Sequence, residues 1–267
     1  RYPDGNAYEL KEAISKKYSV DPNQITIGNG SNDLIEFVSR CFLGEGKKAI
    51  YSQHGFAIYP LAIKATGALP VKSKAKNWGH DLELMTDLID DKTKVIFIAS
   101  PNNPTGTAKT LLEIKDFLNN LPDDILVFLD QAYYEYIEGS EFDIPFSLID
   151  DHPNLVISRS FSKAHGLAAL RLGFCVSSLE LSDYLNRVRQ PFNANSLALD
   201  LGKVALSDQE HISKSVKINS SGMERVKKAF ANLDYNFIES WGNFISFDAK
   251  QDSDVAFQYF LEKGVIL

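Results

Sequence analysis

The sequence predicts an α/β protein in which a doubly wound, mostly parallel sheet lies between two layers of helices. The main observation is three apolar runs without polar alternation, at residues 94–99, 125–129 and 155–157. Strands of this composition are buried on both faces, as in a parallel sheet. Segments with helical spacing lie between the runs, and strands that alternate with helices predict a three-layer fold whose ligands collect at the carboxyl ends of the strands.

Composition and charge limit the possible functions. A chain of 267 residues with 44% apolar content can bury a full core. The net charge of -7 and the lack of a clustered basic stripe argue against nucleic acid as a partner. No apolar run of about eighteen residues and no basic leader occurs, so neither a membrane span nor a signal peptide is expected. Cys41 and Cys175 lie in apolar segments, which favours free thiols in a reducing cytoplasm, and the histidines lack the spacing of metal ligands.

The elements before the first long strand follow from apolar periodicity. They are, in order, a helix over 10–18, a strand at 24–27, a helix over 34–42, a strand at 49–51, a helix around 61–63 and a strand at 68–71. In the glycine turn 28–33, Ser31 is the expected N-cap, so free N–H groups and the positive end of the helix dipole would face a phosphate. The turn is not a dinucleotide fingerprint, because Asp33 replaces its third glycine, and no P-loop G-K-[ST] follows.

The second half of the chain continues the alternation. After the strand at 94–99 we expect a helix over 111–121, the strands at 125–129 and 155–157, a strand at 174–176, a helix after Leu179, helices over 197–206 and 223–233, and strands at 235–238 and 244–247. Residues 1–215 would form a large domain and residues 216–267 a smaller, incomplete α+β domain. The chain starts without methionine and stops in an apolar run, so we expect residues to be missing at both ends.

Polar side chains follow the buried strands at the points where the strands end. Asn103 lies in the loop 100–106, whose prolines and glycine fix the backbone path. Asp130 ends the next strand and leads to Tyr133, and the segment 160–163 follows the third strand. Because carboxyl ends of parallel strands meet at one edge of a sheet, we expect these groups to converge on one crevice.

The converging groups are those that pyridoxal phosphate needs. A lysine amine forms an imine with the aldehyde of this cofactor. An aspartate beside the pyridine nitrogen keeps it protonated, so the ring can accept the electron pair released at the α-carbon of the substrate. An aromatic ring stacks on the pyridine, and tyrosine and asparagine bind its phenolate oxygen. Serines, backbone N–H groups and an arginine bind the phosphate through charge-assisted hydrogen bonds.

The motifs resemble those of the fold-type I pyridoxal-phosphate aminotransferases. The matching segments are GNGSND at 28–33, SPNNPTG at 100–106, DQAY at 130–133 and SFSK at 160–163, with Arg171 eight residues after the lysine. In order and wording they are most similar to the histidinol-phosphate aminotransferases, including RYPD at 1–4. The resemblance covers nearly the whole chain, and the combination is more specific than any single motif.

The resemblance implies a role for each matched residue. Lys163 would be the imine lysine and proton shuttle, and Asp130 the partner of the pyridinium. Tyr133 and Asn103 would hold the phenolate oxygen, and Phe56 would stack on the ring. The phosphate would be bound by Ser31, Asn32, Ser160, Ser162 and Arg171, and by Tyr2 of a neighbouring subunit, which implies a homodimer with shared sites.

The implied reaction is ping-pong transamination of an amino donor and a 2-oxo acid. For the histidinol-phosphate branch, L-histidinol phosphate and 2-oxoglutarate would give imidazole acetol phosphate and glutamate. Phe56, Gln131 and His165 stand where Tyr, Glu and Phe are commoner in the family. The family arginine that binds the substrate carboxylate would lie beyond Leu267.

Three alternative functions fit parts of the sequence. The segment 160–163 also satisfies S-x-x-K of serine hydrolases, but the K-T-G and S-D-N partners are absent from the sequence. A pyridoxal-phosphate-binding regulatory module would need an attached DNA-binding domain, and the sequence contains no basic helix-turn-helix. An aminotransferase or decarboxylase of the same fold that acts on an aromatic or phospho-amino acid remains open, because a few pocket side chains decide the substrate.

Overall fold

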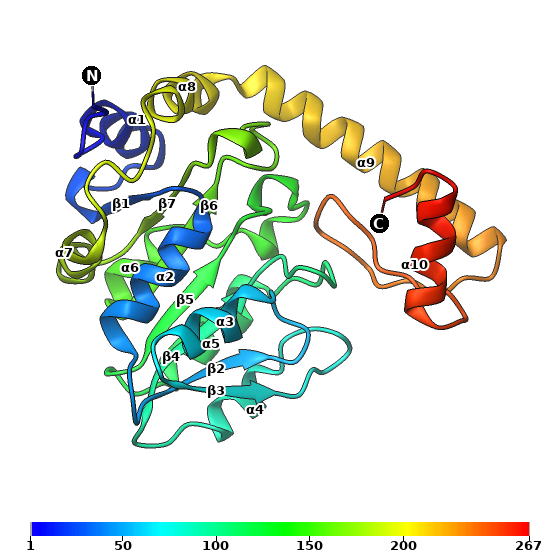
Figure 1. Cartoon of the computed structure of the whole chain (residues 1–267), viewed down its shortest axis with the longest axis horizontal. Helices are drawn as coiled ribbons and strands as arrows, with labels where there is room; N and C mark the ends of the chain where they lie inside the picture. Colours follow the sequence, from blue (N-terminus) through cyan, green and yellow to red (C-terminus); the bar gives the residue numbers. More distant parts are fainter. Residues whose placement is uncertain (1, 267) are drawn as a thin grey trace.

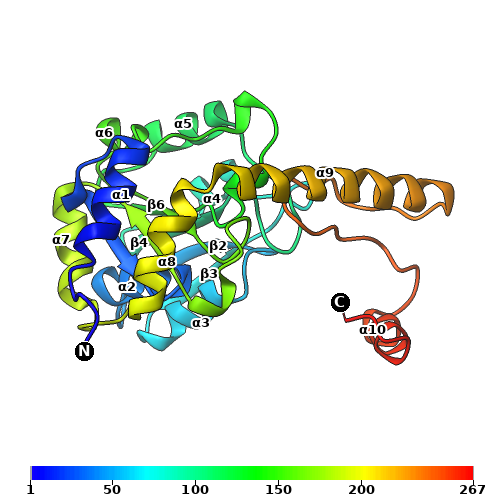
Figure 2. The ribbon, with the colours of Figure 1, turned by 90° about the horizontal axis from the view of Figure 1, so that it is seen from above.

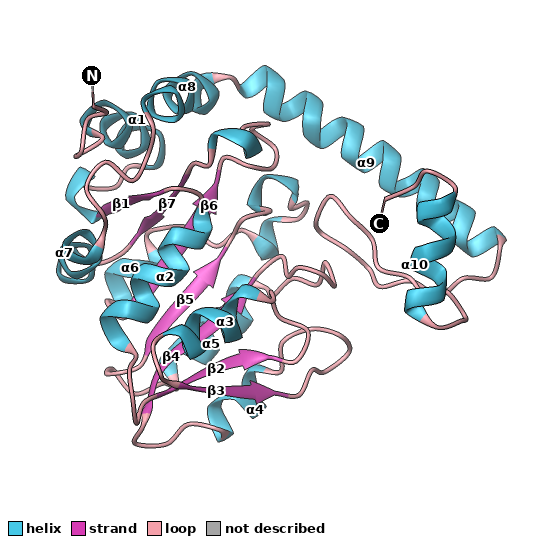
Figure 3. Ribbon diagram, viewed as in Figure 1, coloured by secondary structure: helices cyan, strands magenta, loops and turns pink. Residues whose placement is uncertain are grey.

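A seven-stranded sheet forms the centre of the computed structural model, which describes residues 2–266 and leaves Arg1 and Leu267 outside the described range (Figures 1 and 3). The strand order is β1-β7-β6-β5-β4-β2-β3. The strands are β1 (Ile25–Gly28), β2 (Lys48–Ser52), β3 (Leu69–Ser73), β4 (Thr93–Ala99), β5 (Leu126–Asp130), β6 (Leu155–Ser160) and β7 (Gly173–Val176). β7 is antiparallel to both of its neighbours, and the other neighbouring pairs are parallel. The predicted mostly parallel α/β sheet is confirmed.

Helices cover both faces of the sheet. Along β4, Val95 and Phe97 point to one face and Ile96 and Ile98 to the other, so each face has its own apolar core. The first core is covered by α2 (Ser31–Phe42), α3 (Ile58–Ala65) and α7 (Leu179–Val188). The second is covered by α1 (Tyr8–Tyr18), α4 (Leu82–Asp87), α5 (Leu111–Asn119), α6 (Leu148–Asp151) and α8 (Ser196–Ser207). Figure 2 shows α5 and α6 on one side of the strands and α2 and α3 on the other.

Most predicted helices are present, with shifted ends. The helices α1, α2, α3, α5, α7 and α8 coincide with predicted segments. The short helices α4 and α6 were not predicted, because six and four residues give too few turns for a periodic pattern. Residues 253–262 form α10 (Ser253–Glu262), a further helix that was not predicted.

One long helix leaves the sheet. α9 (Gln209–Asn232) has 24 residues and runs away from the sheet (Figures 1 and 2). The helix predicted at 223–233 corresponds only to its second half, because the first half is rich in serine and charged residues. The predicted domain boundary between 215 and 216 falls inside α9, and the division into two domains stays a prediction.

The strands predicted at 235–238 and 244–247 are wrong. Phe237 and Phe247 form an isolated antiparallel bridge, and Ile238 N donates to the Ser246 carbonyl oxygen at 2.9 Å. Two short segments without a third strand form at best a marginal sheet. Ring packing stabilises them instead, since Phe230 of α9 stacks on Phe247 with ring centroids 4.7 Å apart.

Three further findings concern membrane-spanning helices, metal ligands and thiols. Between residues 2 and 266, no helix has the length and apolar character needed to cross a membrane. Over the same range, no group of His, Cys, Asp or Glu is arranged to hold a metal ion. Cys175 is buried and Cys41 is half-buried, and both are free thiols. Burial raises the pKa of Cys175 to about 12, so this thiol is unreactive at neutral pH.

Candidate active site

The loops that follow the central strands enclose a cleft of about 230 Å³. It lies at the carboxyl ends of β4, β5 and β6, beside the N-terminus of α2. Every predicted site residue except Tyr2 lines it: Ser31, Asn32, Phe56, Asn103, Asp130, Tyr133, Ser160, Ser162, Lys163 and Arg171. Residues far apart in the sequence therefore meet at one place, as the argument from strand ends predicted.

Asp130 provides a buried carboxyl group at one end of the cleft. It is the last residue of β5 and is 5% exposed. Ser158 Oγ donates to Asp130 Oδ1 at 3.2 Å, and Ala132 N donates to the same oxygen at 3.1 Å. Burial raises the pKa of this carboxyl group, whereas its hydrogen bonds and the charge of Lys163 act in the opposite direction. A cationic group on a ligand would therefore find a desolvated counter-charge here.

Tyr59 supports Asp130 and was not among the predicted site residues. Its hydroxyl donates to Asp130 Oδ2 at 3.1 Å, and its ring stacks on Phe97 with centroids 5.0 Å apart. Burial raises its pKa well above the ordinary value, and Asp130 raises it further, so the hydroxyl stays protonated and donates. Phe56 lies on the cleft wall, and its ring is edge-on to that of Tyr59 with ring centroids 5.8 Å apart. A tyrosine in a short apolar helix carries no local signal of this contact.

Lys163 places an amine opposite a phenol. Its Nζ lies 4.9 Å from the centroid of the Tyr133 ring, and Asn103 Nδ2 donates to the Tyr133 hydroxyl at 3.1 Å. Gly166 N donates to the Lys163 carbonyl oxygen at 2.9 Å and closes the turn that carries the lysine. An amine and a phenol–amide pair thus line the same cleft as Asp130.

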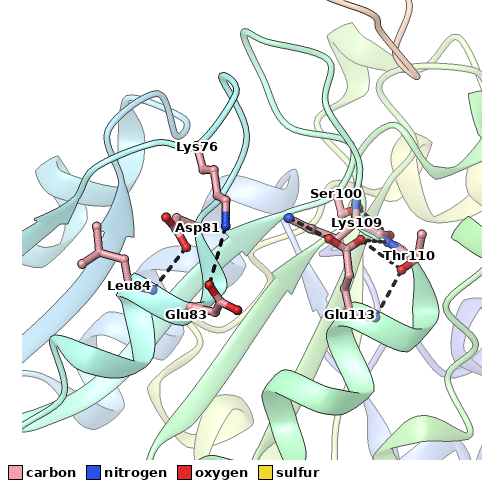
Figure 4. A network of polar contacts seen from close by, with 8 residues as sticks. All are labelled: Lys76, Asp81, Glu83, Leu84, Ser100, Lys109, Thr110 and Glu113. Atoms are coloured by element: carbon pink, nitrogen blue, oxygen red, sulfur yellow. Dashed lines mark hydrogen bonds and ion pairs between the residues drawn. The ribbon is translucent and has the colours of Figure 1, made fainter.

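The loop that carries Asn103 is anchored at both ends. At its start, Asn102 Nδ2 donates to the His54 carbonyl oxygen at 2.9 Å. At its end, Lys109 N donates to Ser100 Oγ at 2.9 Å, and Thr110 and Glu113 form a capping box that begins α5 (Figure 4). These bonds fix the backbone on both sides of Asn103 and so restrict the position of its side chain.

The N-terminus of α2 also lines the cleft, together with Arg171 and Ser162. Ser31 is the first residue of α2 rather than its N-cap, which corrects the prediction; Gly30 is the N-cap, and no side chain caps the helix. The N–H groups of the first turn, at Ser31 and Asn32, are therefore free for a ligand. Arg171 Nη1 donates to Ser162 Oγ at 3.3 Å, and this brings a guanidinium and a hydroxyl to the same part of the cleft.

Glycine is favoured at position 30 for two reasons. Its φ of +84° lies in the region that disfavours other residues, and a Cβ there would displace the guanidinium of Arg171 from its present position. Because Gly30 has no side chain, it cannot accept a hydrogen bond from the free N–H groups of α2. The same absence leaves room for Arg171 to reach the N-terminus of the helix.

Tyr2 lies apart from the cleft of its own chain. It is 78% exposed and stacks on Phe192 with ring centroids 4.9 Å apart. The predicted role of Tyr2 concerns a neighbouring subunit, and it stays a prediction.

Comparison with known proteins gives one family and several relatives. The family model described as "Aminotransferase class I and II" matches residues 1–267. Histidinol-phosphate aminotransferase 2 of Pseudomonas aeruginosa is 47% identical over 267 residues, which are 100% of this chain and 72% of that protein. The protein of the same name from Haemophilus influenzae strain 86-028NP is 48% identical over 100% of this chain and 73% of its own length.

Solved structures share the fold at lower identity. The histidinol-phosphate aminotransferase from Sinorhizobium meliloti, solved in complex with pyridoxal-5'-phosphate, has a TM-score of 0.94 at 24% identity and covers 100% of this chain and 74% of that chain. The L-threonine-O-3-phosphate decarboxylase from Porphyromonas gingivalis has a TM-score of 0.86 at 24% identity, over 100% of this chain and 79% of that chain. Two reactions thus occur on this fold, so the fold alone does not select between them.

Proposed function

The chain belongs to the class I and II aminotransferases, and from that premise we propose that it transfers the amino group of L-histidinol phosphate to 2-oxoglutarate with pyridoxal phosphate as cofactor. The products would be imidazole acetol phosphate and L-glutamate. The substrate assignment rests on the 47% and 48% identity to histidinol-phosphate aminotransferases over the whole chain. The two substrates would use one cleft in turn, in a ping-pong cycle.

The donor set of the cleft fits pyridoxal phosphate. The buried carboxyl group of Asp130 would pair with the pyridinium nitrogen, and Tyr133 and Asn103 would bind the phenolate oxygen. The free N–H groups of α2 and the guanidinium of Arg171 would bind the phosphate. When bound, the cofactor supplies an electron-accepting ring that stabilises negative charge at the α-carbon of the substrate.

Lys163 carries the covalent attachment and the proton transfer in this proposal. Among the residues that line the cleft, it supplies the only lysine amine. The neutral amine is a nucleophile and a base, and its position beside the Tyr133 ring keeps it inside the cleft. Lys163 would therefore take up the proton of the substrate α-carbon at Nζ and return it beyond the imine nitrogen, to the carbon that was the aldehyde of the cofactor.

The setting of the reaction is also inferred. We propose a homodimer, because Tyr2 is exposed outside its own cleft and is free to reach the phosphate end of a neighbouring site. We infer a reducing cytoplasm from the two free cysteines. Residues 1–215 and 216–267 would be the two domains, joined within α9.

A spectroscopic titration tests the function. L-histidinol phosphate is added to the full-length protein loaded with pyridoxal phosphate, and the visible absorbance band is followed. We expect the band to shift to that of the amino form of the cofactor and to return when 2-oxoglutarate is added. The substrate assignment is wrong if another amino donor converts the band and histidinol phosphate does not. Release of CO₂ from a phospho-amino acid would instead identify a decarboxylase.

A variant tests the site separately. Lys163→Ala should form no lysine adduct that borohydride reduces, as measured by mass spectrometry after digestion. A reducible lysine adduct in this variant would show that another lysine binds the cofactor.

A further inference from the structure

A second polar layer lies on the far side of β6 from the cleft. Ser158 contacts Asp130 and Ser160 lines the cleft, so Arg159, between them in the strand, points to the opposite face. Arg159 is 3% exposed. Its guanidinium carbon lies 3.4 Å from the centroid of the Tyr134 ring and 4.3 Å from that of Phe146. A charge at this depth needs a counter-charge, because burial in aromatic surroundings removes its water.

The members of this layer are sequence neighbours of the cleft residues. Arg159 Nε donates to Oε1 of Gln131, which follows Asp130, at 3.3 Å. Glu135 lies two residues after Tyr133, and its Oε1 is 3.8 Å from Nδ1 of His165. His165 in turn lies two residues after Lys163. The segments that carry the chemistry on one side of the sheet thus meet again on the other side.

Glu135 is the buried carboxyl group of this layer, and its measured neighbour is the His165 ring. Its side chain is 9% exposed and its Oε2 has no hydrogen-bond partner, and neither ring nitrogen of His165 has one. Burial raises the pKa of Glu135, whereas the charges of Arg159 and Lys17 lower it. Gln131 is an amide and adds no charge beside the guanidinium.

His165 is neutral in this layer. Burial lowers its pKa to about 4, and the basic groups Lys17 on α1, His211 on α9 and Arg159 on β6 act in the same direction. Among the described groups that face His165, Glu135 is the acidic one, and Lys17, His211 and Arg159 are basic.

We propose that Glu135 is a positioning residue of the active site, whose buried carboxylate balances Arg159 and holds the segments that carry Tyr133 and Lys163 in register. The proposal rests on the roles proposed above for those two residues. Loss of the carboxylate leaves Arg159 buried without a counter-charge, and the strand-end segments shift to admit water to it. Shifts of about 1 Å are enough to lower the rate about 100-fold.

Moving the carboxylate tests this proposal. Glu135→Gln removes the negative charge with little change in shape. The double variant Gln131→Glu/Glu135→Gln returns it on the other side of the guanidinium, where Gln131 Oε1 is already 3.3 Å from Arg159 Nε. Glu135→Asp keeps the charge on a shorter side chain. Glu141→Gln, an exposed change on the neighbouring 3-10 helix, is the matched control.

Two measurements are made on each full-length variant: urea unfolding without cofactor, and the Kd for pyridoxal phosphate with kcat. Glu135→Gln should lower the urea midpoint, raise Kd by about tenfold or more and lower kcat by a similar factor. The double variant should recover most of both losses, Glu135→Asp part of them, and the control should match the wild type.

Two other outcomes argue against the proposal. If Glu135→Gln unfolds more readily but keeps the wild-type Kd and kcat, the carboxylate is only structural. If the double variant recovers neither property, charge balance at Arg159 is not its role. If Glu135→Gln does not fold, the double variant decides, because a folded and active double variant supports the proposal and an unfolded one overturns it. A wild type that binds no pyridoxal phosphate would refute the proposed function, while the unfolding series would still decide the charge balance.

Discussion

Replacement of Asp130 by asparagine should separate the effect of its charge from that of its hydrogen bonds. The amide oxygen of the introduced side chain, in the place of Oδ1, can still accept from Ser158 Oγ and Ala132 N. The amide nitrogen, in the place of Oδ2, can donate to the Tyr59 hydroxyl, which then accepts. The geometry is kept and the negative charge is lost. The consequences differ in sign between the cofactor-free and the cofactor-bound protein.

Without cofactor, the variant should be at least as stable as the wild type at neutral pH. Burial raises the folded-state pKa of Asp130 above 3.8, so the stabilisation from the protonated carboxyl group is complete below 3.8 and is lost as the pH rises through the folded-state pKa. An asparagine side chain does not titrate. The stability of the variant relative to the wild type should therefore rise with pH through this window.

With cofactor, the variant should lose a buried ion pair. Removing one partner of such a pair costs about 3–5 kcal/mol, which corresponds to a Kd for pyridoxal phosphate raised by roughly 100-fold or more. The assay is thermal unfolding with and without cofactor, together with absorbance titration. Asp123→Asn, an exposed change in the turn before β5, is the control. A variant that binds the cofactor within about threefold of the wild type would refute the charge assignment of Asp130.

Three further changes follow from the same structure. Arg171→Lys should raise the Kd for pyridoxal phosphate about tenfold, because an ammonium cannot replace the planar guanidinium in the proposed phosphate site. An unchanged Kd would show that Arg171 does not bind the phosphate. Gly30→Ala should weaken cofactor binding and lower the melting temperature, because its Cβ would displace the Arg171 guanidinium at a φ of +84°. Gly222→Ala, at a helical position with open space, should raise the melting temperature instead. Equal changes of melting temperature in the two variants would contradict this reasoning. His80, whose Nε2 lies 2.9 Å from the Ala99 carbonyl oxygen, has its pKa lowered to about 4 by burial, so its contribution to stability is complete above the ordinary value of 6.5 and is lost as the pH falls toward 4. Urea midpoints of His80→Gln at about pH 7 and about pH 5 should differ less than those of the wild type, and an equal difference would show that His80 does not titrate in this way.

The contents of the cleft could be predicted because strand ends are a local property of the sequence. The buried runs that end before Asn103, Asp130 and Ser160 fix where each side chain leaves the sheet, and the shared direction of β4, β5 and β6 brings them together. The cap at Ser31 was misplaced by one residue, because helix ends depend on backbone angles that the residue types alone do not set. The strands predicted near residue 240 failed because a strand needs a partner of sufficient length.

By itself, the sequence determined the α/β class, the positions of the buried strands along the chain and which side chains follow their ends. These features are local, because periodicity and turn residues act over a few positions. Only the tertiary structure decided which distant groups touch. Tyr59 reaches Asp130 across 71 positions, and Arg159 meets Gln131 across 28. Such contacts depend on how strands and helices pack in three dimensions. A buried charge and its balancing group can therefore be recognised only after the chain has folded around them.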